Sequence, residues 1–174
     1  MGYTHPDNFK VKRLPFSYAV WDLEMVEVLS RYQKGCNIHL FVDTGMNREG
    51  IRIEELEAFL SKIRSIPGLN VDGLCSHFAD ASSVSNVSRA FTAKQLVLFE
   101  DALRLVRAAG FDPLWRHISA SGGIPQDIHH PFTLIRGGIA CYGIQPDPRK
   151  AIHAISPVMR FVSTLVSVKM IKKR

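Results

Sequence analysis

The chain has 174 residues, of which 46% are hydrophobic and 22% charged, and its formal net charge is +6. This composition is typical of one globular domain and excludes a chain that is disordered as its main state. No window approaches the ~18 continuous apolar residues of a membrane helix, and the first residues, MGYTHPDNFKVKR, lack the apolar segment of a secretory signal.

The basic residues are scattered along the chain, apart from the final KMIKKR, and they lack the aromatic-basic interleaving that proteins binding single-stranded nucleic acid use. That distribution argues against nucleic acid as a partner and favours an anionic cofactor or substrate. The three cysteines, Cys36, Cys75 and Cys141, are far apart and form no CxxC pair. They predict neither a zinc site nor a disulfide framework, and we expect a reducing, cytoplasmic location with no membrane partner.

The first third of the chain alternates between strand-like and helical segments. FSYAVW (16–21) and NIHLFV (37–42) predict strands. Asp22 is placed to cap a helix over LEMVEVLSRY (23–32), which a glycine soon ends. IEELEAFLSKIRS (53–65) predicts a second helix, whose inner face carries Ile53, Leu56, Leu60 and Ile63.

The same alternation continues into the second half. VDGLCSHF (71–78) predicts a strand, and the polar loop ADASSVSNVS follows it. Thr92 and Gln95 predict a capping box for the next helix, which extends through Ala109. The residues of this helix that face inward are Leu96, Phe99, Leu103 and Val106. LWRHIS and TLIRGG predict two further short strands, and IACYGI turns out of the second.

About five strands alternating with amphipathic helices predict βαβ units, a parallel sheet and hence the α/β class. A doubly wound sheet often carries a GxGxxG turn after its first strand, and none is present. A (β/α)8 TIM-type barrel collects its chemistry at the C-terminal ends of its strands, where the polar residues of this chain cluster. We therefore predict a partial barrel over residues 1–156, since five strands cannot close one. A β-rich unit is predicted to begin in residues 157–174, which contain VMRFVSTLVSVKMI.

Four residues at or near strand ends are candidates for a site. Arg136 precedes two glycines in LIRGGIACYGI; buried there, it needs an acceptor such as a ring nitrogen or a carboxylate, although the glycine pair fits a plain bend equally well. Ser121, in RHISASGG, suits an oxyanion better than nucleophilic chemistry because the leading glycine of G-x-S-x-G is missing. His77 has no partner histidine at metal-ligand spacing, so no metal is expected. His117 is either a core histidine or a group that orients another residue.

VDTGMNREG, SHFADA, RHISASGG and IRGGIACYGIQP, in this order and spacing, resemble alanine racemase from about Ser17 to the end of the chain. The resemblance implies an N-terminal (β/α)8 barrel followed by a β-rich domain, of which this chain covers about strands four to eight and the first strand of the second domain. It also implies a homodimer and the cofactor pyridoxal 5'-phosphate (PLP). The implied reaction interconverts L-alanine and D-alanine through a PLP aldimine and supplies D-alanine for peptidoglycan.

The resemblance implies a role for each cofactor-binding residue. Arg136, oriented by His77, hydrogen-bonds the pyridine nitrogen of PLP. Ser121 holds the phosphate together with the backbone N–H groups of Gly138 and Ile139. Because an arginine donates hydrogen bonds and does not give up its proton, the ring nitrogen stays unprotonated, which discourages side reactions such as transamination.

Arg48, at the end of the DTGMNREG turn, is implied to face the PLP phenolic oxygen and the substrate carboxylate. Phe41 stands where many family members have a lysine, often carbamylated, so Arg48 must find another partner. Ala120 replaces a frequent asparagine before the phosphate-binding serine.

Both bases of the family are missing from this chain. The lysine that anchors PLP belongs to a motif like A-x-x-K-A-x-A-Y-G-H-G, which does not occur here. The tyrosine base belongs to the C-terminal domain of the partner subunit, whereas Tyr142 matches a barrel position. We therefore expect the isolated chain to be inactive.

Other functions remain open at this point. The chain fits a fragment of a broad-specificity amino-acid racemase, or of an enzyme like D-threonine aldolase, although the latter needs a metal pair for which no ligand cluster is evident. A non-catalytic remnant that binds PLP weakly, or pairs with a separate piece carrying the lysine, is a further alternative. A structural protein without a ligand leaves the polar strand ends unexplained.

Overall fold

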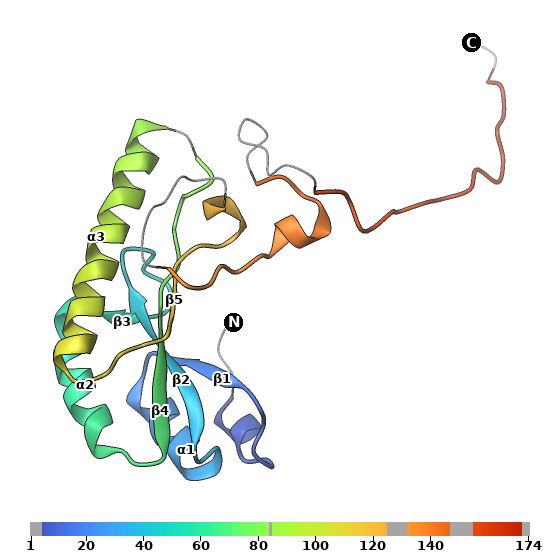
Figure 1. The fold of residues 1–174 in the computed structure, drawn as a ribbon. Coiled ribbons are helices and arrows are strands. Elements are labelled where there is room, and N and C mark those ends of the chain that lie inside the picture. Colours follow the sequence, from blue (N-terminus) through green and yellow to red (C-terminus); the bar gives the residue numbers. More distant parts are fainter. Residues whose placement is uncertain (1–4, 84, 125–131, 147–154, 172–174) are drawn as a thin grey trace.

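The computed structural model describes residues 5–83, 85–124, 132–146 and 155–171, and a parallel sheet lies at its centre (Figure 1). The main strands are β1 (Ser17–Val20), β2 (Cys36–Asp43), β4 (Leu69–Cys75) and β5 (Trp115–His117), hydrogen-bonded in the order β1-β2-β4-β5. A short strand that was not predicted, β3 (Ile51–Arg52), pairs in parallel with the end of β2.

Helices separate the main strands along the chain. They are α1 (Leu23–Tyr32), α2 (Leu56–Ser65) and α3 (Asn86–Ala108). Four short 3-10 helices complete the described structure: η1 (Pro6–Phe9), η2 (Ile53–Glu55), η3 (Ser121–Gly123) and η4 (Ile139–Tyr142). The predicted α/β class with a parallel sheet is confirmed, since every pairing between strands is parallel in the described ranges.

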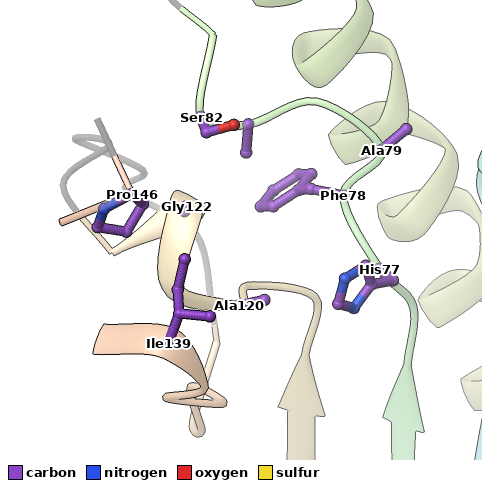
Figure 2. Close-up of a pocket in the computed structure, with 10 residues that line it drawn as sticks. His77, Phe78, Ala79, Ser82, Ala120, Gly122, Ile139 and Pro146 are labelled. Atoms are coloured by element: carbon purple, nitrogen blue, oxygen red, sulfur yellow. The ribbon is translucent and has the colours of Figure 1, made fainter. Parts of the chain in front are cut away.

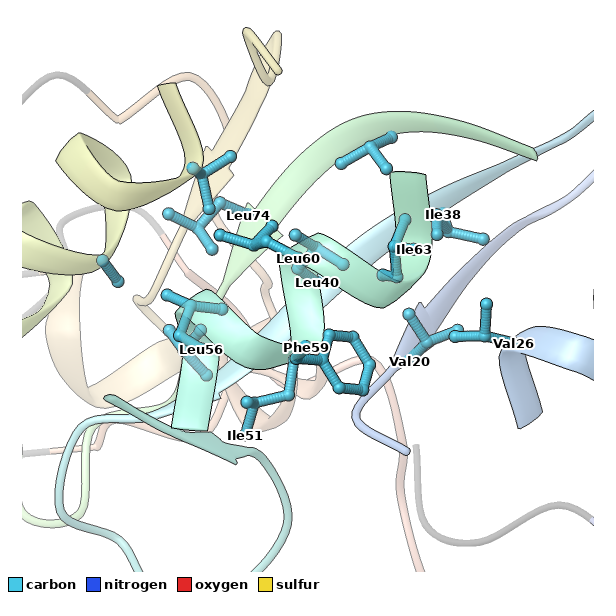
Figure 3. Close-up of a cluster of buried hydrophobic side chains, with 14 of the residues drawn as sticks. Val20, Val26, Ile38, Leu40, Ile51, Leu56, Phe59, Leu60, Ile63 and Leu74 are labelled. Atoms are coloured by element: carbon cyan, nitrogen blue, oxygen red, sulfur yellow. The ribbon is translucent and has the colours of Figure 1, made fainter. Parts of the chain in front are cut away.

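The core lies between the sheet and the helices, as Figure 3 shows. Burial alternates along β2, so Ile38, Leu40 and Val42 are fully buried while the residues between them are only partly so. Leu60 of α2 and Leu74 of β4 pack in the same cluster. Burying one such side chain contributes roughly 1.5–3 kcal/mol, so this cluster holds the helices against the sheet.

The ends of α1 follow the predicted local chemistry. The carboxylate of Asp22 accepts a hydrogen bond from the backbone N–H of Met25 at 2.7 Å, which satisfies one of the free donors of the first turn. Beyond the helix, Gly35 has a φ of +78°, a conformation that glycine adopts without a steric penalty. Asp22 and Gly35 therefore fix where α1 begins and where the chain reverses toward β2.

The predicted capping box is wrong. Helix α3 begins at Asn86, earlier than predicted, because Ser85 caps it by accepting from the backbone N–H of Ser88 at 3.0 Å. Thr92 and Gln95 consequently lie within the helix, and Gln95 is completely buried on its inner face.

The segment TLIRGG is not a regular strand, contrary to prediction. It runs beside β5, and two backbone hydrogen bonds join them, from Thr133 N to Arg116 O (3.0 Å) and from Arg136 N to Ser119 O (3.1 Å). These contacts are too few and too far apart to form a ladder. They nevertheless hold Arg136 next to the end of β5.

Residues 155–171 contain no helix or strand and extend away from the sheet (Figure 1). The large apolar side chains from Val158 to Ile171 are exposed, and those of Phe161 and Met170 are fully so. The predicted β-rich unit from residue 157 stays a prediction, and residues 172–174 lie outside the described ranges. No helix in the described ranges is both long and apolar enough to cross a membrane.

Candidate functional site

The turn after β2 is organised by its aspartate. The carboxylate of Asp43 accepts hydrogen bonds from the backbone N–H groups of Gly45 (2.9 Å) and Asn47 (3.1 Å). Asn47 has a φ of +54°, which asparagine tolerates better than most residues. The acidic residue of DTGMNREG therefore stabilises the turn by accepting hydrogen bonds from the backbone of the turn itself.

Arg48 forms an ion pair with the neighbouring carboxylate of Glu49. The hydrogen bond from Arg48 lowers the pKa of Glu49. Phe41, which stands where the resemblance implies a lysine, packs edge-to-face against Trp21, with ring centroids 6.3 Å apart. The described residues thus provide Arg48 with Glu49 as its acidic partner, which sequence reasoning missed.

Arg136 lies at the centre of the site, where the ends of β4 and β5 meet. One guanidinium nitrogen, Nη2, donates to the backbone carbonyls of Ser76 (2.7 Å) and Ile118 (3.2 Å) and contacts Nδ1 of His77 at 2.9 Å. The other, Nη1, contacts Nδ1 of His117. Since a guanidinium only donates, both imidazoles accept at Nδ1.

These imidazoles are neutral because of their surroundings. Burial lowers the pKa of His77, and the charge of Arg136 lowers it further. Burial, followed by the charge of Arg136, lowers the pKa of His117 to about 3. Arg48 also contributes to the lowered pKa values of His77 and Arg136, so its charge acts on the same site. Of the two readings of His117, the contacts support the one in which it orients another residue.

Ser121 is the second focus of the site. It opens the 3-10 helix η3 and is almost fully buried. Its Oγ accepts hydrogen bonds from the backbone N–H groups of Gly138 (2.9 Å) and Ala140 (3.2 Å). Because these bonds occupy its lone pairs, the O–H proton of Ser121 is left to donate to a ligand.

A pocket of about 200 Å³ opens between the loops after β4 and β5 (Figure 2). His77, Phe78 and Ser82 line it from one side, and Gly122 and Ile139 from the other. A Cβ atom at Gly122 would approach the backbone nitrogen of Ser82 to 3.2 Å, so glycine lets the two loops come this close. Among the described residues, those that line the pocket include neither a lysine nor a tyrosine.

A buried amide holds the loop that carries His77. Gln95 of α3 accepts from the backbone N–H of Ala79 (3.0 Å) and donates to the carbonyl of His77 (3.0 Å) and to Oγ1 of Thr44 (3.2 Å). Thr44 in turn shares a hydrogen bond of 2.8 Å with Ser76. This amide links the turn after β2 to the end of β4, and its helical position alone did not reveal that role.

The structure therefore brings together most of the residues singled out from the sequence. Arg136 contacts His77, Ser121 accepts from Gly138, and Ile139 lines the same pocket as His77. Arg136 and Ser121 are not among the residues that line this pocket, but Arg136 contacts His77, which does, and Ser121 precedes Gly122, which does. A fixed guanidinium and a hydroxyl donor beside a cavity suit a flat ligand bearing a ring acceptor and an anion. In the described ranges no group of three or more His, Cys, Asp or Glu side chains is placed to hold a metal ion.

Comparison with known proteins gives a consistent result. The family model described as "Alanine racemase, N-terminal domain" matches residues 1–146. The alanine racemase of Treponema denticola is 33% identical over 159 residues, which cover 88% of this chain and 42% of that protein. The alanine racemase of Geobacter sulfurreducens is 34% identical over 163 residues, covering 90% of this chain and 42% of that protein. This chain thus spans about two fifths of the length of these relatives.

Solved structures agree on the fold. Alanine racemase from Bacillus anthracis with bound L-Ala-P has a TM-score of 0.71 and 28% identity, over 81% of this chain and 38% of that chain. Alanine racemase from Clostridium difficile in complex with cycloserine has a TM-score of 0.75 over 90% of this chain and 44% of that chain; at 23% identity it supports the fold alone. The predicted partial barrel is confirmed by these likenesses.

Proposed function

The chain belongs to the alanine racemase family, and from that premise we propose that its pocket binds PLP for the racemisation of an amino acid, alanine. The observation that carries the proposal is Arg136, a mostly buried guanidinium held by two neutral imidazoles at the strand ends. A cation so fixed is a permanent donor for a ring nitrogen.

The residues present fit PLP at both of its ends. Arg136 would donate to the ring nitrogen, and His77 and His117 hold its guanidinium in place for that bond. Ser121 would donate its O–H to the phosphate, beside the backbone of Gly138 and Ile139. When bound, PLP supplies the electron sink that makes the α-proton of an amino acid removable.

Arg48 would bind the carboxylate of the amino acid and face the phenolic oxygen of PLP. Its ion pair with Glu49 steadies the guanidinium, and half of the Arg48 side chain remains exposed for a ligand. A carboxylate bound by arginine forms a charge-assisted pair, which orients the substrate for proton transfer.

Proton transfer itself needs bases, and the described part of the pocket lining contains neither a lysine nor a tyrosine. We therefore propose that the isolated chain binds PLP without forming a Schiff base at a pocket lysine and does not racemise alanine. In the wider proposal, which rests on the family alone, the active enzyme is a cytoplasmic homodimer that supplies D-alanine for peptidoglycan.

PLP titration of the purified chain tests this proposal, with pyridoxal as the ligand that lacks the phosphate. Ser121→Ala should weaken PLP binding about tenfold or more, since a hydrogen bond to a charged group contributes roughly 1.5–3 kcal/mol. The same variant should leave pyridoxal binding nearly unchanged. Arg136→Leu should weaken the binding of both PLP and pyridoxal. Arg104→Leu, which changes an exposed arginine of α3, should weaken the binding of neither.

Borohydride reduction followed by mass spectrometry separates specific binding from reaction with surface lysines. The proposal predicts no stoichiometric label on any single lysine. Equal affinity for PLP and pyridoxal, or no affinity for PLP, would contradict it. Racemisation of alanine by the purified chain would contradict the proposed inactivity.

A further inference from the structure

A row of polar side chains leads from Arg136 into the sheet. Arg136 contacts Nδ1 of His117, and Nε2 of His117 lies 2.9 Å from Nδ1 of His39. Nε2 of His39 then lies 3.3 Å from Oδ1 of Asp72. The row joins β5, β2 and β4, and its first three members line a second pocket, of about 480 Å³, on the less buried face of the sheet.

This row is possible because Gly73 has no side chain. Strand β4 lies between β2 and β5, so the His39 ring must cross β4 to reach His117. It crosses at Gly73, its partner in the strand register. A Cβ atom there would collide with the ring and lie 2.6 Å from its Nδ1.

Asp72 reaches His39 because of an irregularity in the same strand. The register pairs Ile38 with Val71 and then His39 with Gly73, so Asp72 is the extra residue of a β-bulge. A bulge re-aims the side chain of its extra residue. Here it directs a carboxylate toward the imidazole that crosses the neighbouring glycine.

The contacts allow only one arrangement of protons. Arg136 can only donate, so Nδ1 of His117 accepts and its single proton lies on Nε2. That proton is donated to Nδ1 of His39, which leaves the proton of His39 on Nε2, facing Asp72. The row therefore begins with a cation that only donates and ends at a carboxyl oxygen, an acceptor that lies 3.3 Å from Nε2 of His39.

The burial of these side chains and the shifts in their pKa values agree with this arrangement of protons. Nε2 of His39 and Oδ1 of Asp72 are buried and face each other at 3.3 Å, and neither atom makes a hydrogen bond among the described residues. Burial lowers the pKa of His39 and lowers that of His117 to about 3, so both imidazoles carry a single proton near neutral pH. Burial also raises the pKa of Asp72, an effect that the neighbouring His39 opposes.

We propose that Asp72 and His39 are positioning residues, which keep the proton of His117 on Nε2 so that its Nδ1 holds the Arg136 guanidinium in place. If Asp72 were absent, His39 could take its other tautomer and donate to His117, which could then no longer accept from Arg136. Two donors would face each other, and Arg136 would leave its position. The effect on PLP rests on the proposed function, whereas the order of the protons does not.

Two-bond ¹H–¹⁵N spectra of the chain labelled with ¹⁵N-histidine report the tautomers directly. In the unsubstituted protein, His39 and His117 should both carry their proton on Nε2. Asp72→Leu should convert His117 to a mixture of tautomers, and Gly73→Ala should do the same by pushing the His39 ring aside. Asp72→Asn keeps an oxygen that accepts from His39 and should restore the single tautomer.

Asp112→Leu, which removes an exposed carboxylate, is the matched control and should leave the spectra of both His39 and His117 unchanged. Circular dichroism and thermal melting verify that each variant is folded. If Asp72→Leu does not fold, the comparison of Gly73→Ala with the folded Asp72→Asn decides. An Nδ1–H tautomer of His117 in the unsubstituted protein would overturn the proposal, as would an unchanged His117 spectrum in folded Asp72→Leu or Gly73→Ala.

PLP titration of the same variants separates the two proposals. We expect about tenfold weaker PLP binding for Asp72→Leu and Gly73→Ala, and no change for Asp72→Asn and Asp112→Leu. If the tautomers are as predicted but the unsubstituted protein binds no PLP, the proposed function fails and the order of the protons stands. If the tautomers are mixed in the variants and PLP binding is unchanged, the positioning role is refuted while PLP binding stands.

Discussion

Gln95→Leu should destabilise the fold by about 3 kcal/mol. The side chain is completely buried and makes three hydrogen bonds, to Ala79 N, His77 O and Thr44 Oγ1. Leucine fills a similar volume but can make none of them. A buried hydrogen bond contributes on the order of 1 kcal/mol net, so the three together give this figure.

Urea denaturation followed by circular dichroism measures the change in the free energy of unfolding. For a chain of this size a loss of about 3 kcal/mol lowers Tm by roughly 6–12 °C. Lys94→Leu, at the preceding, exposed position of the same helix, is the control and should change stability by less than about 0.5 kcal/mol.

The result also bears on the site, because Gln95 holds the backbone on either side of Phe78. We expect PLP to bind less tightly to Gln95→Leu even where the protein remains folded. A loss of stability below about 1 kcal/mol, or one equal to that of Lys94→Leu, would refute the reasoning that these hydrogen bonds hold the loop.

Two further predictions concern titratable groups. Since the pKa of His117 is about 3 when folded and about 6.5 when unfolded, the unfolded chain binds more protons at acidic pH. The free energy of unfolding should therefore be at its full value above about pH 6.5 and fall as the pH drops toward 3; in His117→Asn this slope should be smaller, and an unchanged slope would contradict the assignment. Burial raises the pKa of Cys36 and raises that of Cys75 to about 12, whereas Cys141 is exposed. A thiol reagent should thus label one cysteine per chain rapidly, and that rapid phase should disappear in Cys141→Ser; its persistence would show that a buried thiol is accessible.

Short sequence patterns predicted the helix ends and strands whose formation depends on neighbouring residues in the sequence. Asp22 caps α1 because its carboxylate needs only a backbone N–H three residues away. The strands and helices predicted in the first 75 residues are confirmed with shifted bounds, since the spacing of apolar residues specifies which face is buried. The helix predicted from Ile53 begins as the 3-10 helix η2, and α2 starts at Leu56.

Local patterns did not predict contacts between residues that are far apart in the sequence. Gln95 matches a capping box locally, but its side chain bonds to Thr44, which is 51 positions away in the sequence. His39 meets His117 across 78 positions, and the contact depends on the empty space at Gly73. Neither could be inferred without the register of β2 against β4. The alternation of β2 did carry one usable signal, because His39 stands on the face opposite Leu40 and its apolar neighbours.

The alternating burial along β2 separates two kinds of selective constraint. Ile38, Leu40 and Val42 pack under the helices, so their replacement costs folding energy. His39 and Phe41 lie on the other face and are under a different constraint. His39 belongs to the row of polar side chains, and Phe41 packs against Trp21. Replacing His39 or Phe41 would therefore leave the core under the helices in place and would remove instead the contact with His117 or with Trp21. One strand thus carries two separable functions, the stability of the fold on one face and the polar and aromatic contacts on the other.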